Sequence, residues 1–451
     1  MDYSKIKKVH IIGIEGGGTS ALACMYKDMG LEVTGSDEGD HFFQDILLSK
    51  GIKLFDKFDP NNIPNDADLV VYSSAFKPET NSELASASNP VSYAEALAGL
   101  FNQKNGIAVA GSHGKTTITA WLGYVMEQAG LKPSMIVGAK VPQLNGSSLA
   151  GKSDYFLIEA DEYQNKLKYY EPNMVLLSNV DYDHPDFFES QDDYINVFIE
   201  FIKKIPASGW LAANYDDDTI INISKTNCKA KIIGYGIDNE KVNYLAKDIS
   251  YNNHEQSFSV NDLGRFKIKL LGKHNVSNAL AVIAACLELG IDLEVIKKYL
   301  AEFAGTVRRL QQLGKYNNVP VLDDFAHHPT EIMATLDTVR QIYPDNRLVV
   351  VFHPHTFTRT KALFNDFLNS FDLVDELIIL DIYGSAREER GGVSSQDLVE
   401  KIKLIYPKKE IKHLPSLFDA EQYLKHNLRD NDVLLLIGAG DVFKIGENLI
   451  K

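Results

Sequence analysis

The chain has 451 residues, which is more than one hydrophobic core usually supports, so we expect two to four domains. Its 45% apolar and 24% charged residues are typical of a globular protein rather than a disordered or membrane protein. The net charge of −15 argues against a nucleic-acid partner, which would require a basic face.

The first residues, MDYSKIKKVHIIGI, lack the long apolar core of a signal peptide, and no apolar run is long enough to predict a membrane span. The three cysteines, Cys24, Cys228 and Cys286, are scattered, which favours neither a disulfide framework nor a cysteine-based zinc site. We therefore expect a cytoplasmic protein. The sequence leaves its oligomeric state open.

Short apolar runs alternate with longer segments of helical period through most of the chain, which is typical of parallel α/β sheets. The segment from residue 234 to 273 is polar and alternating instead, and predicts a small antiparallel insertion. The expected parallel strands are Val9–Ile14, Val33–Gly35, Leu69–Ser73, Ile107–Ala110, Phe156–Ile158, Met174–Leu177, Leu348–Phe352, Leu377–Leu380 and Val433–Ile437.

These elements fall into three blocks, which we predict to be domains with boundaries at residues 1–105, 106–306 and 307–451. The first block opens with a glycine-rich turn between a strand and a helix, formed by Gly13, Gly16, Gly17 and Gly18. A dinucleotide fingerprint would have another glycine at Glu15, so the match is imperfect. With Asp37 after the next strand, the turn predicts either a nucleotide diphosphate site or a purely structural turn.

The second block opens with GIAVAGSHGKTTITAW, in which an apolar strand enters a tight loop and then a helix. Glycines let backbone N–H groups surround phosphate oxygens, and the helix start directs its dipole at the same anion. A lysine there can reach the β- and γ-phosphates, and a threonine hydroxyl can bind Mg²⁺. The loop is a short form of the P-loop, because Val109 stands where a further glycine is usual. The expected phosphate-binding residues are Gly111, Ser112, His113, Gly114, Lys115, Thr116 and Thr117.

Two polar clusters follow later strands of this block, EADEY with Glu159 and NVDYDHPDF with His184. Ligands of parallel sheets bind at the carboxyl ends of strands, so both clusters should lie at the edge that carries the phosphate loop. Carboxylates and one histidine there could hold Mg²⁺ or Mn²⁺ against ATP oxygens. Taken singly, each cluster could also be an ordinary solvated loop.

The remaining motifs are GKHNVSN, with His274 and Asn275, then VRRLQQLG, with Arg309, and several polar strand ends in the third block. The first could simply cap a helix, and the arginine could swing onto a γ-phosphate when domains close. In the third block, Asp324, His327 and Arg359 should share one sheet edge with further histidines. Their spacing matches no zinc motif.

In this order, GSHGKTT, EADE, NVDYDH, GKHNVSN, VRRLQQLG, DDFAHHPTE, HPHTFTRT and GAGD resemble the Mur ligases of peptidoglycan synthesis over essentially the whole chain. The resemblance implies three α/β domains: an N-terminal Rossmann-like domain, a central P-loop ATPase-type domain with a parallel sheet, and a C-terminal Rossmann-like domain. These would bind a UDP-sugar, ATP and an amino acid respectively. It also implies an ATP-dependent ligase that works through an acyl phosphate.

The resemblance assigns roles to residues. Lys115 would contact the triphosphate, and Thr116, Glu159 and His184 would hold Mg²⁺. The adenine contacts would be His274 and Asn275, with Asp324 on the ribose and Arg309 on the γ-phosphate. His327 and Arg359 would face the amino acid. The sugar nucleotide would contact Gly13, Gly16, Gly17, Gly18, Asp37, Ser73 and Ser74.

Within the family, the likeness is greatest to members that add L-alanine to UDP-N-acetylmuramate, because the Thr358–Thr360 signature is kept and Ile199 stands where later ligases carry a modified lysine. Thr356 stands where many of these members have an arginine, so the sequence departs from the family pattern at this position. A ligase that attaches a murein tripeptide to the same acceptor is the alternative. The first glycine turn alone would also suit an NAD-binding oxidoreductase or a nucleotide sensor.

Overall fold

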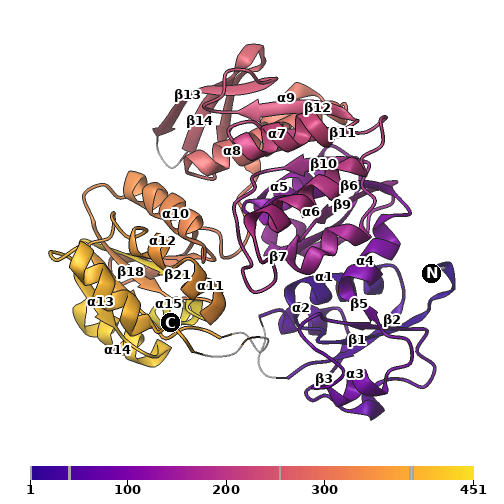
Figure 1. Cartoon of the computed structure of the whole chain (residues 1–451), viewed down its shortest axis with the longest axis horizontal. Helices are drawn as coiled ribbons and strands as arrows, with labels where there is room; N and C mark the ends of the chain where they lie inside the picture. The colour runs from indigo at the N-terminus through magenta and orange to yellow at the C-terminus, as the bar shows by residue number, and fades with distance from the viewer. Residues whose placement is uncertain (1–2, 39–41, 253–254, 385–387, 389–390) are drawn as a thin grey trace.

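The computed structural model describes residues 3–38, 42–252, 255–384, 388 and 391–451. The chain forms three α/β bodies, each built on its own sheet (Figure 1). The α/β class with three sheets agrees with the sequence prediction. The exact boundaries at residues 105 and 306 stay a prediction.

The N-terminal body is a five-stranded parallel sheet of order β3-β2-β1-β4-β5. Its core strands carry the expected apolar runs, and Ile11 and Val71 are fully buried. The elements are β1 (Lys8–Ile12), α1 (Gly17–Asp28), β2 (Glu32–Ser36), α2 (Gln44–Ser49), β3 (Lys53–Phe55), β4 (Leu69–Tyr72), α3 (Ser82–Ser86), β5 (Val91–Ser92) and α4 (Tyr93–Phe101).

The middle body holds a ten-stranded sheet of order β15-β14-β13-β12-β11-β10-β6-β9-β7-β8. Its centre is parallel, whereas β13, β14 and β15 pair antiparallel, as the alternating sequence there predicts. The strands are β6 (Asn105–Ala110), β7 (Ser134–Val141), β8 (Gly146–Leu149), β9 (Tyr155–Glu159), β10 (Met174–Leu177), β11 (Trp210–Asn214), β12 (Lys231–Gly236), β13 (Tyr244–Asn252), β14 (Glu255–Val260) and β15 (Gly264–Ile268). The helices are α5 (Lys115–Gln128), α6 (Gln191–Lys203), α7 (Asp218–Asn227), α8 (Lys273–Glu288) and α9 (Leu293–Glu302).

The C-terminal body has a six-stranded sheet of order β16-β17-β21-β18-β19-β20, parallel except for the edge strand β16. The strands are β16 (Gln311–Tyr316), β17 (Val319–Asp324), β18 (Arg347–Phe352), β19 (Glu376–Ile379), β20 (Glu410–His413) and β21 (Asp432–Ile437). The helices are α10 (Pro329–Ile342), α11 (Phe357–Ala362), α12 (Phe364–Leu368), α13 (Ser395–Ile405), α14 (Leu417–Asn427) and α15 (Phe443–Leu449).

Short 3₁₀ helices cover Tyr3–Lys5, Pro60–Asn62, Pro142–Leu144, Tyr163–Tyr169 and Asn261–Leu263. Within the described residues, no helix combines the length and apolar character that crossing a membrane would demand.

The three bodies lie next to one another (Figure 1), and individual contacts join them in pairs. Gly17 at the start of α1 lies so close to the middle body that an added Cβ would be 3.2 Å from the Gly138 carbonyl oxygen. Phe42 of the N-terminal body packs edge-on against Phe443 of the C-terminal body, with ring centroids 5.6 Å apart. The sequence ranges that carry the predicted site therefore converge on one region.

Candidate active site

The phosphate loop lies between β6 and α5, as predicted from its sequence. Gly111 and Gly114 have φ angles of 128° and 82°, in the region that favours glycine. A Cβ on Gly111 would lie 2.2 Å from the Ser178 hydroxyl, and one on Gly114 would lie 2.7 Å from the Asn278 amide oxygen. Both positions therefore require glycine, and they leave a narrow backbone cradle at the start of α5.

Lys115 begins α5 and is held tightly by its surroundings. Its ammonium donates hydrogen bonds to the carbonyl oxygens of Gly111 and Ser112, at 2.5 and 3.1 Å. It also pairs with the Glu162 carboxylate at 2.8 Å, where the side chains are 11% and 1% exposed. Burial alone would lower the pKa of Lys115, but the neighbouring carboxylates raise it, so the side chain is a cation.

Thr116 and Glu159 form one oxygen-rich pair beside the loop. The Thr116 hydroxyl donates a hydrogen bond to Glu159 Oε1 at 2.7 Å, and Glu159 Oε2 accepts one from the Gly138 N–H at 2.8 Å. A hydroxyl and a carboxylate are ligands that Mg²⁺ accepts. The donor types of this pair therefore fit the predicted metal.

His184 lies with a second acid group rather than with Glu159. Its Nε2 is 3.6 Å from the Glu162 carboxylate, and the donor atoms of Asp161, Glu162 and His184 all lie within 4.8 Å of one another. The predicted ligands thus belong to two groups, and acids of both groups raise the pKa of Lys115. Of the predicted EADEY cluster, only Glu159 was expected to be a metal ligand, whereas Asp161 and Glu162 are the acids beside His184.

A first cavity of about 520 Å³ opens beside the loop, between the middle and C-terminal bodies. Of the predicted nucleotide contacts, it is lined by His113, Gly114, Thr117, His274, Asn275, Arg309 and Asp324.

The base of this cavity combines neutral and acidic groups. Burial lowers the pKa of His274 to about 4, so its ring is neutral, and its Nε2 lies 3.0 Å from the Asn275 amide. Asp324 lines the same cavity, is buried and accepts hydrogen bonds from the Leu310 and Ala326 N–H groups, at 2.6 and 2.8 Å. Neutral nitrogens and a carboxylate in one cavity suit a nucleoside.

The two adjacent arginines after the second body have different surroundings. Arg308 is tied into the C-terminal body by Asp323 at 3.2 Å and by the Gly438 carbonyl oxygen at 2.6 Å. Arg309 lines the cavity instead, over the Phe325 ring at 5.3 Å and 4.0 Å from Glu331. The structure therefore singles out Arg309 as the arginine that a phosphate in this cavity could meet.

A second cavity of about 420 Å³ lies on the other side of the loop, toward the N-terminal body. The predicted sugar-nucleotide residues that line it are Gly16, Gly17, Gly18, Ser73 and Ser74, and Lys115 and Glu159 line it too. Gly13 and Asp37 are not among its lining residues. Asp37 instead accepts a hydrogen bond from the Glu15 N–H at 2.8 Å, which shapes the glycine turn from behind.

In the C-terminal body, Arg359 reaches across to the middle body. Its guanidinium forms a buried two-point ion pair with Asp183, at 2.9 and 3.1 Å. Burial would raise the pKa of Asp183, but Arg359 holds it well below its usual range. Arg359 also lies 3.3 Å from His355, whose ring is 6.0 Å from that of His327. Asp183 belongs to the predicted polar cluster NVDYDHPDF, but its pairing with Arg359 was not predicted.

The phosphate loop thus separates two cavities and contributes to both. His113, Gly114 and Thr117 face the first cavity, whereas Lys115 faces the second. A triphosphate in the first cavity and an acid in the second would meet at this loop, where Lys115 supplies positive charge. Such an arrangement is suited to phosphoryl transfer.

Comparison with known families gives three matches along the chain. The family models are described as Mur ligase family, catalytic domain, for residues 8–105, as Mur ligase middle domain, for 109–286, and as Mur ligase, glutamate ligase domain, for 308–440. The sequence is 41% identical to a UDP-N-acetylmuramate–L-alanine ligase of Clostridium acetobutylicum, over 99% of this chain and 98% of that protein. It is 38% identical to the protein of the same name from Caldanaerobacter subterraneus, over 100% and 99%.

Known structures give the same picture of the fold. The UDP-N-acetylmuramate–alanine ligase of Thermotoga maritima superposes with a TM-score of 0.81 at 25% identity, over 98% of each chain. The murein peptide ligase of Psychrobacter arcticus gives 0.76 at 24% identity, also over 98% of each, which is a likeness of fold.

Proposed function

Because the chain belongs to the Mur ligase family, we propose that it joins L-alanine to the carboxylate of UDP-N-acetylmuramate in a reaction driven by ATP. The observation that carries the proposal is the position of the phosphate loop between two cavities, with Lys115 and Glu159 facing the N-terminal glycine turn. An oxidoreductase or a nucleotide sensor has no need of this second nucleotide site.

The proposed reaction has two steps. The muramoyl carboxylate attacks the γ-phosphorus of ATP, which gives an acyl phosphate and ADP. The amine of L-alanine then attacks the acyl carbon, and phosphate leaves from the tetrahedral intermediate.

The residues around the loop fit these steps. The N–H groups at the start of α5 and the Lys115 ammonium would stabilise charge on the transferred phosphoryl group, and Arg309 would do so from the C-terminal body. Thr116 and Glu159, with the nearby group of His184, would hold a magnesium ion that neutralises the phosphates. His274 and Asn275 would orient the adenine, and Asp324 the ribose.

The third body would bind the amino acid near His327 and Arg359. Burial lowers the pKa of His327 to about 4, so this histidine is neutral at physiological pH. A neutral ring can accept a hydrogen bond from an ammonium group, and a guanidinium can bind the carboxylate. In this structure Arg359 is paired with Asp183, so a bound amino acid would share or replace that contact.

We place the reaction in the cytoplasm, where ATP and nucleotide sugars are made. The three cysteines are free thiols, with Cys24 and Cys286 buried, which suits a reducing compartment.

A phosphate-release assay tests the substrates directly. Phosphate should appear with ATP, Mg²⁺ and UDP-N-acetylmuramate only when an amino acid is added, and L-alanine should give the highest kcat/KM. Omitting UDP-N-acetylmuramate is the control. Turnover with a murein tripeptide but with no single amino acid would replace this proposal by a recycling ligase.

A further inference from the structure

His113 of the phosphate loop connects the middle body to the C-terminal body. Its Nε2 lies 3.0 Å from Asp181 Oδ2, which follows β10 in the middle body. Its Nδ1 lies 3.2 Å from Glu331 Oε1, in the first turn of α10 of the C-terminal body. Both ring nitrogens therefore face carboxylates, and only the imidazolium form can donate hydrogen bonds to both. Burial alone would lower the pKa of His113, but these two hydrogen bonds raise it to about 9.

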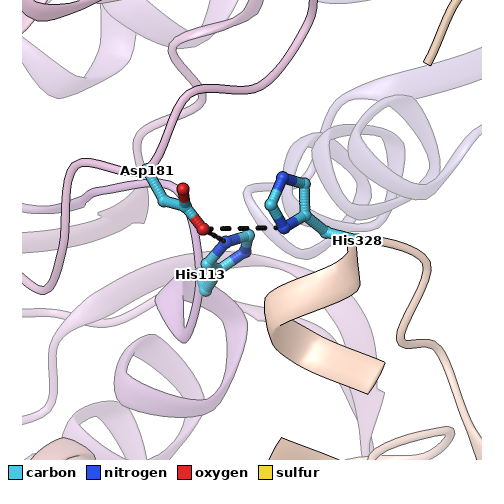
Figure 2. A group of neighbouring side chains, drawn as sticks. All are labelled: His113, Asp181 and His328. Atoms are coloured by element: carbon cyan, nitrogen blue, oxygen red, sulfur yellow. Dashed lines mark hydrogen bonds and ion pairs between the residues drawn. The ribbon is translucent and has the colours of Figure 1, made fainter. Parts of the chain in front are cut away.

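The α10 side of this contact is reinforced around Asp181. The Thr330 hydroxyl donates a hydrogen bond to Asp181 Oδ2 at 2.7 Å. His328 Nδ1 lies 3.5 Å from the same oxygen (Figure 2), but as an acceptor it adds no hydrogen bond to Asp181. Figure 2 shows that His113 and Asp181 come from the middle body, whereas His328 stands at the start of a helix of the C-terminal body.

The two oxygens of Glu331 have separate partners. Oε2 caps α10 by accepting hydrogen bonds from the N–H groups of His327 and His328, at 3.1 and 3.4 Å. Oε1 points the other way, toward His113. One carboxylate thus joins the start of a helix in one body to the phosphate loop of another.

The donor atoms of His113, Asp181 and His328 lie within 4.8 Å of one another, a spacing that would also allow a transition metal. However, His328 Nδ1 already accepts a hydrogen bond from the Thr330 N–H at 3.3 Å. Both nitrogens of His113 are engaged as well. A proton shared with carboxylates accounts for these contacts without an ion.

We propose that His113 is a positioning residue, which holds α10 of the C-terminal body against the phosphate loop through Glu331 and Asp181. The wall of the nucleotide cavity that contains Thr330, Glu331 and Thr335 would then be in place only when this contact is formed. If only a fraction of the molecules have this wall in place, the apparent affinity for a ligand that needs the wall is reduced to that fraction of its full value. The role in ATP binding rests on the proposed function, but the contact itself does not.

Hydrogen exchange of the full chain without ligands tests the contact. His113→Gln should speed exchange of the amides at residues 328–334 by about tenfold, the equilibrium effect of losing one hydrogen bond to a charged group. This change in the middle body would alter a helix of the other body, which a local structural role of His113 would not do. Glu331→Gln should have a similar effect, because its amide oxygen can keep the helix cap while the acceptor for His113 is lost.

The double variant and a charge control make the test specific. If the two residues act through each other, His113→Gln with Glu331→Gln should exceed the larger single effect by less than about twofold. Asp337→Asn removes an exposed negative charge from the same helix and should leave residues 328–334 unchanged. The proposal would be overturned if the rate increases of the two single variants multiplied in the double variant. It would also be overturned if His113→Gln left the exchange rates unchanged. Faster exchange of the wild-type chain in EDTA would also overturn it, because a metal would then hold the contact.

Steady-state kinetics test whether the His113 contact affects ATP binding. In both single variants the KM for ATP should rise about tenfold. The KM for UDP-N-acetylmuramate, which we assign to the other cavity, should change less than twofold. Equal rises in both constants would overturn the link to the nucleotide cavity. Because exchange is measured without substrates, it stays informative even if the acceptor proves to be different.

Discussion

At the scale of single residues, Lys115 differs from the exposed loop lysine that a P-loop sequence alone suggests. Its ammonium is buried against Glu162, so removing it also leaves a buried carboxylate without its partner. Lys115→Met should therefore lower thermal stability as well as reduce turnover by about 10²-fold or more, the scale of one transition-state charge contact. Phosphate release measured below the unfolding transition separates the two effects. A folded Lys115→Met protein with near-normal turnover would remove Lys115 from the chemistry.

The two acid groups beside Lys115 give different predictions for the metal. If Thr116 and Glu159 hold Mg²⁺, Glu159→Gln should raise the Mg²⁺ concentration for half-maximal rate about tenfold, since one charged ligand becomes neutral. The amide oxygen of glutamine can still accept the Gly138 hydrogen bond, and its NH2 group can donate one to the Thr116 hydroxyl, so the fold should be kept. Asp161→Asn is the matched variant in the His184 group. A larger shift for Asp161→Asn would assign the metal to that group instead.

The pH dependence of ATP binding should follow His113. Its pKa is raised from 6.5 to about 9, so its stabilising contribution is fully present below pH 6.5 and is lost as pH rises through 9. Around it, Asp181 and Glu331 have lowered pKa values and stay ionised, and His328 has a lowered pKa and stays neutral. Arg309 lies near Glu331, and His327, whose pKa is about 4, stays neutral in this range.

The KM for ATP of the wild-type enzyme should consequently rise as pH increases from about 7 to 10, and His113→Gln should show a flatter profile. The measurement is initial rate against ATP concentration at each pH, with protein stability checked in parallel. A parallel rise in both proteins would assign the titration to another group.

At the scale of secondary-structure elements, the clearest predictions were strands that are buried on both faces. Runs such as Leu348–Phe352 and Val433–Ile437 become the central strands β18 and β21, because parallel strands between two helical layers are continuously apolar. The edge strand β16 was missed, because its sequence QQLGKY is partly exposed and has no apolar run. Two inner strands, β11 and β17, were missed although they are largely buried.

The sequence predicted part of the candidate site. Polar residues after buried strands were found, because they lie at one sheet edge by topology. The pairs between domains were not found. Asp183 and Arg359 are 176 residues apart, and no periodicity relates positions on different sheets. Their contact depends on how the bodies pack, which local sequence does not encode.

The start of α7 connects element stability to the nucleotide cavity. Asp217 caps this helix by accepting hydrogen bonds from Thr219 and Ile220, and it also accepts one from the Val180 N–H at 2.8 Å, next to Asp181. Asp217→Ala should cost about 1–2 kcal/mol of stability, as for other caps. It should also raise the KM for ATP, because the loop after β10 loses its anchor.

The cap of α9 provides the control for this prediction. Asp292 accepts hydrogen bonds from Glu294 and Val295 in the same way, but it does not line the nucleotide cavity. Asp292→Ala should lower the urea midpoint comparably and leave the KM for ATP unchanged. If both variants alter the KM equally, the effect reflects general destabilisation rather than the anchor at Val180.

At the scale of the whole molecule, the three bodies each hold part of one proposed site, so their packing decides whether the site is complete. The middle and C-terminal bodies meet through the Asp183–Arg359 pair and the His113 contact. The connection between them has an unusual backbone, since Gly305, Arg308 and Leu310 have φ angles of 92°, 60° and 44°. Such angles are costly for non-glycine residues and mark a segment whose conformation its surroundings determine.

This connection is anchored on both sides. The Val307 N–H donates a hydrogen bond to the Lys140 carbonyl oxygen at 3.1 Å in the middle body, and the Phe325 N–H donates one to the Arg308 carbonyl oxygen at 2.8 Å in the C-terminal body. A rotation between the bodies would therefore pivot between residues 307 and 308. Arg309, one residue beyond, would be carried into or out of the nucleotide cavity by that rotation.

We accordingly expect the enzyme to open and close about this pivot, with the arrangement in Figure 1 as the closed form. Closure would exclude water, which otherwise hydrolyses an acyl phosphate. Small-angle scattering with saturating non-hydrolysable ATP analogue and UDP-N-acetylmuramate should match this closed arrangement, and the ligand-free protein should have a larger radius of gyration. Asp183→Asn, which weakens the pair with Arg359, should shift the ligand-free ensemble further toward the open form and raise the ligand concentration needed for compaction. Identical scattering with and without ligands, at every ligand concentration, would show that the bodies are fixed and that Arg309 stays where the present structure has it.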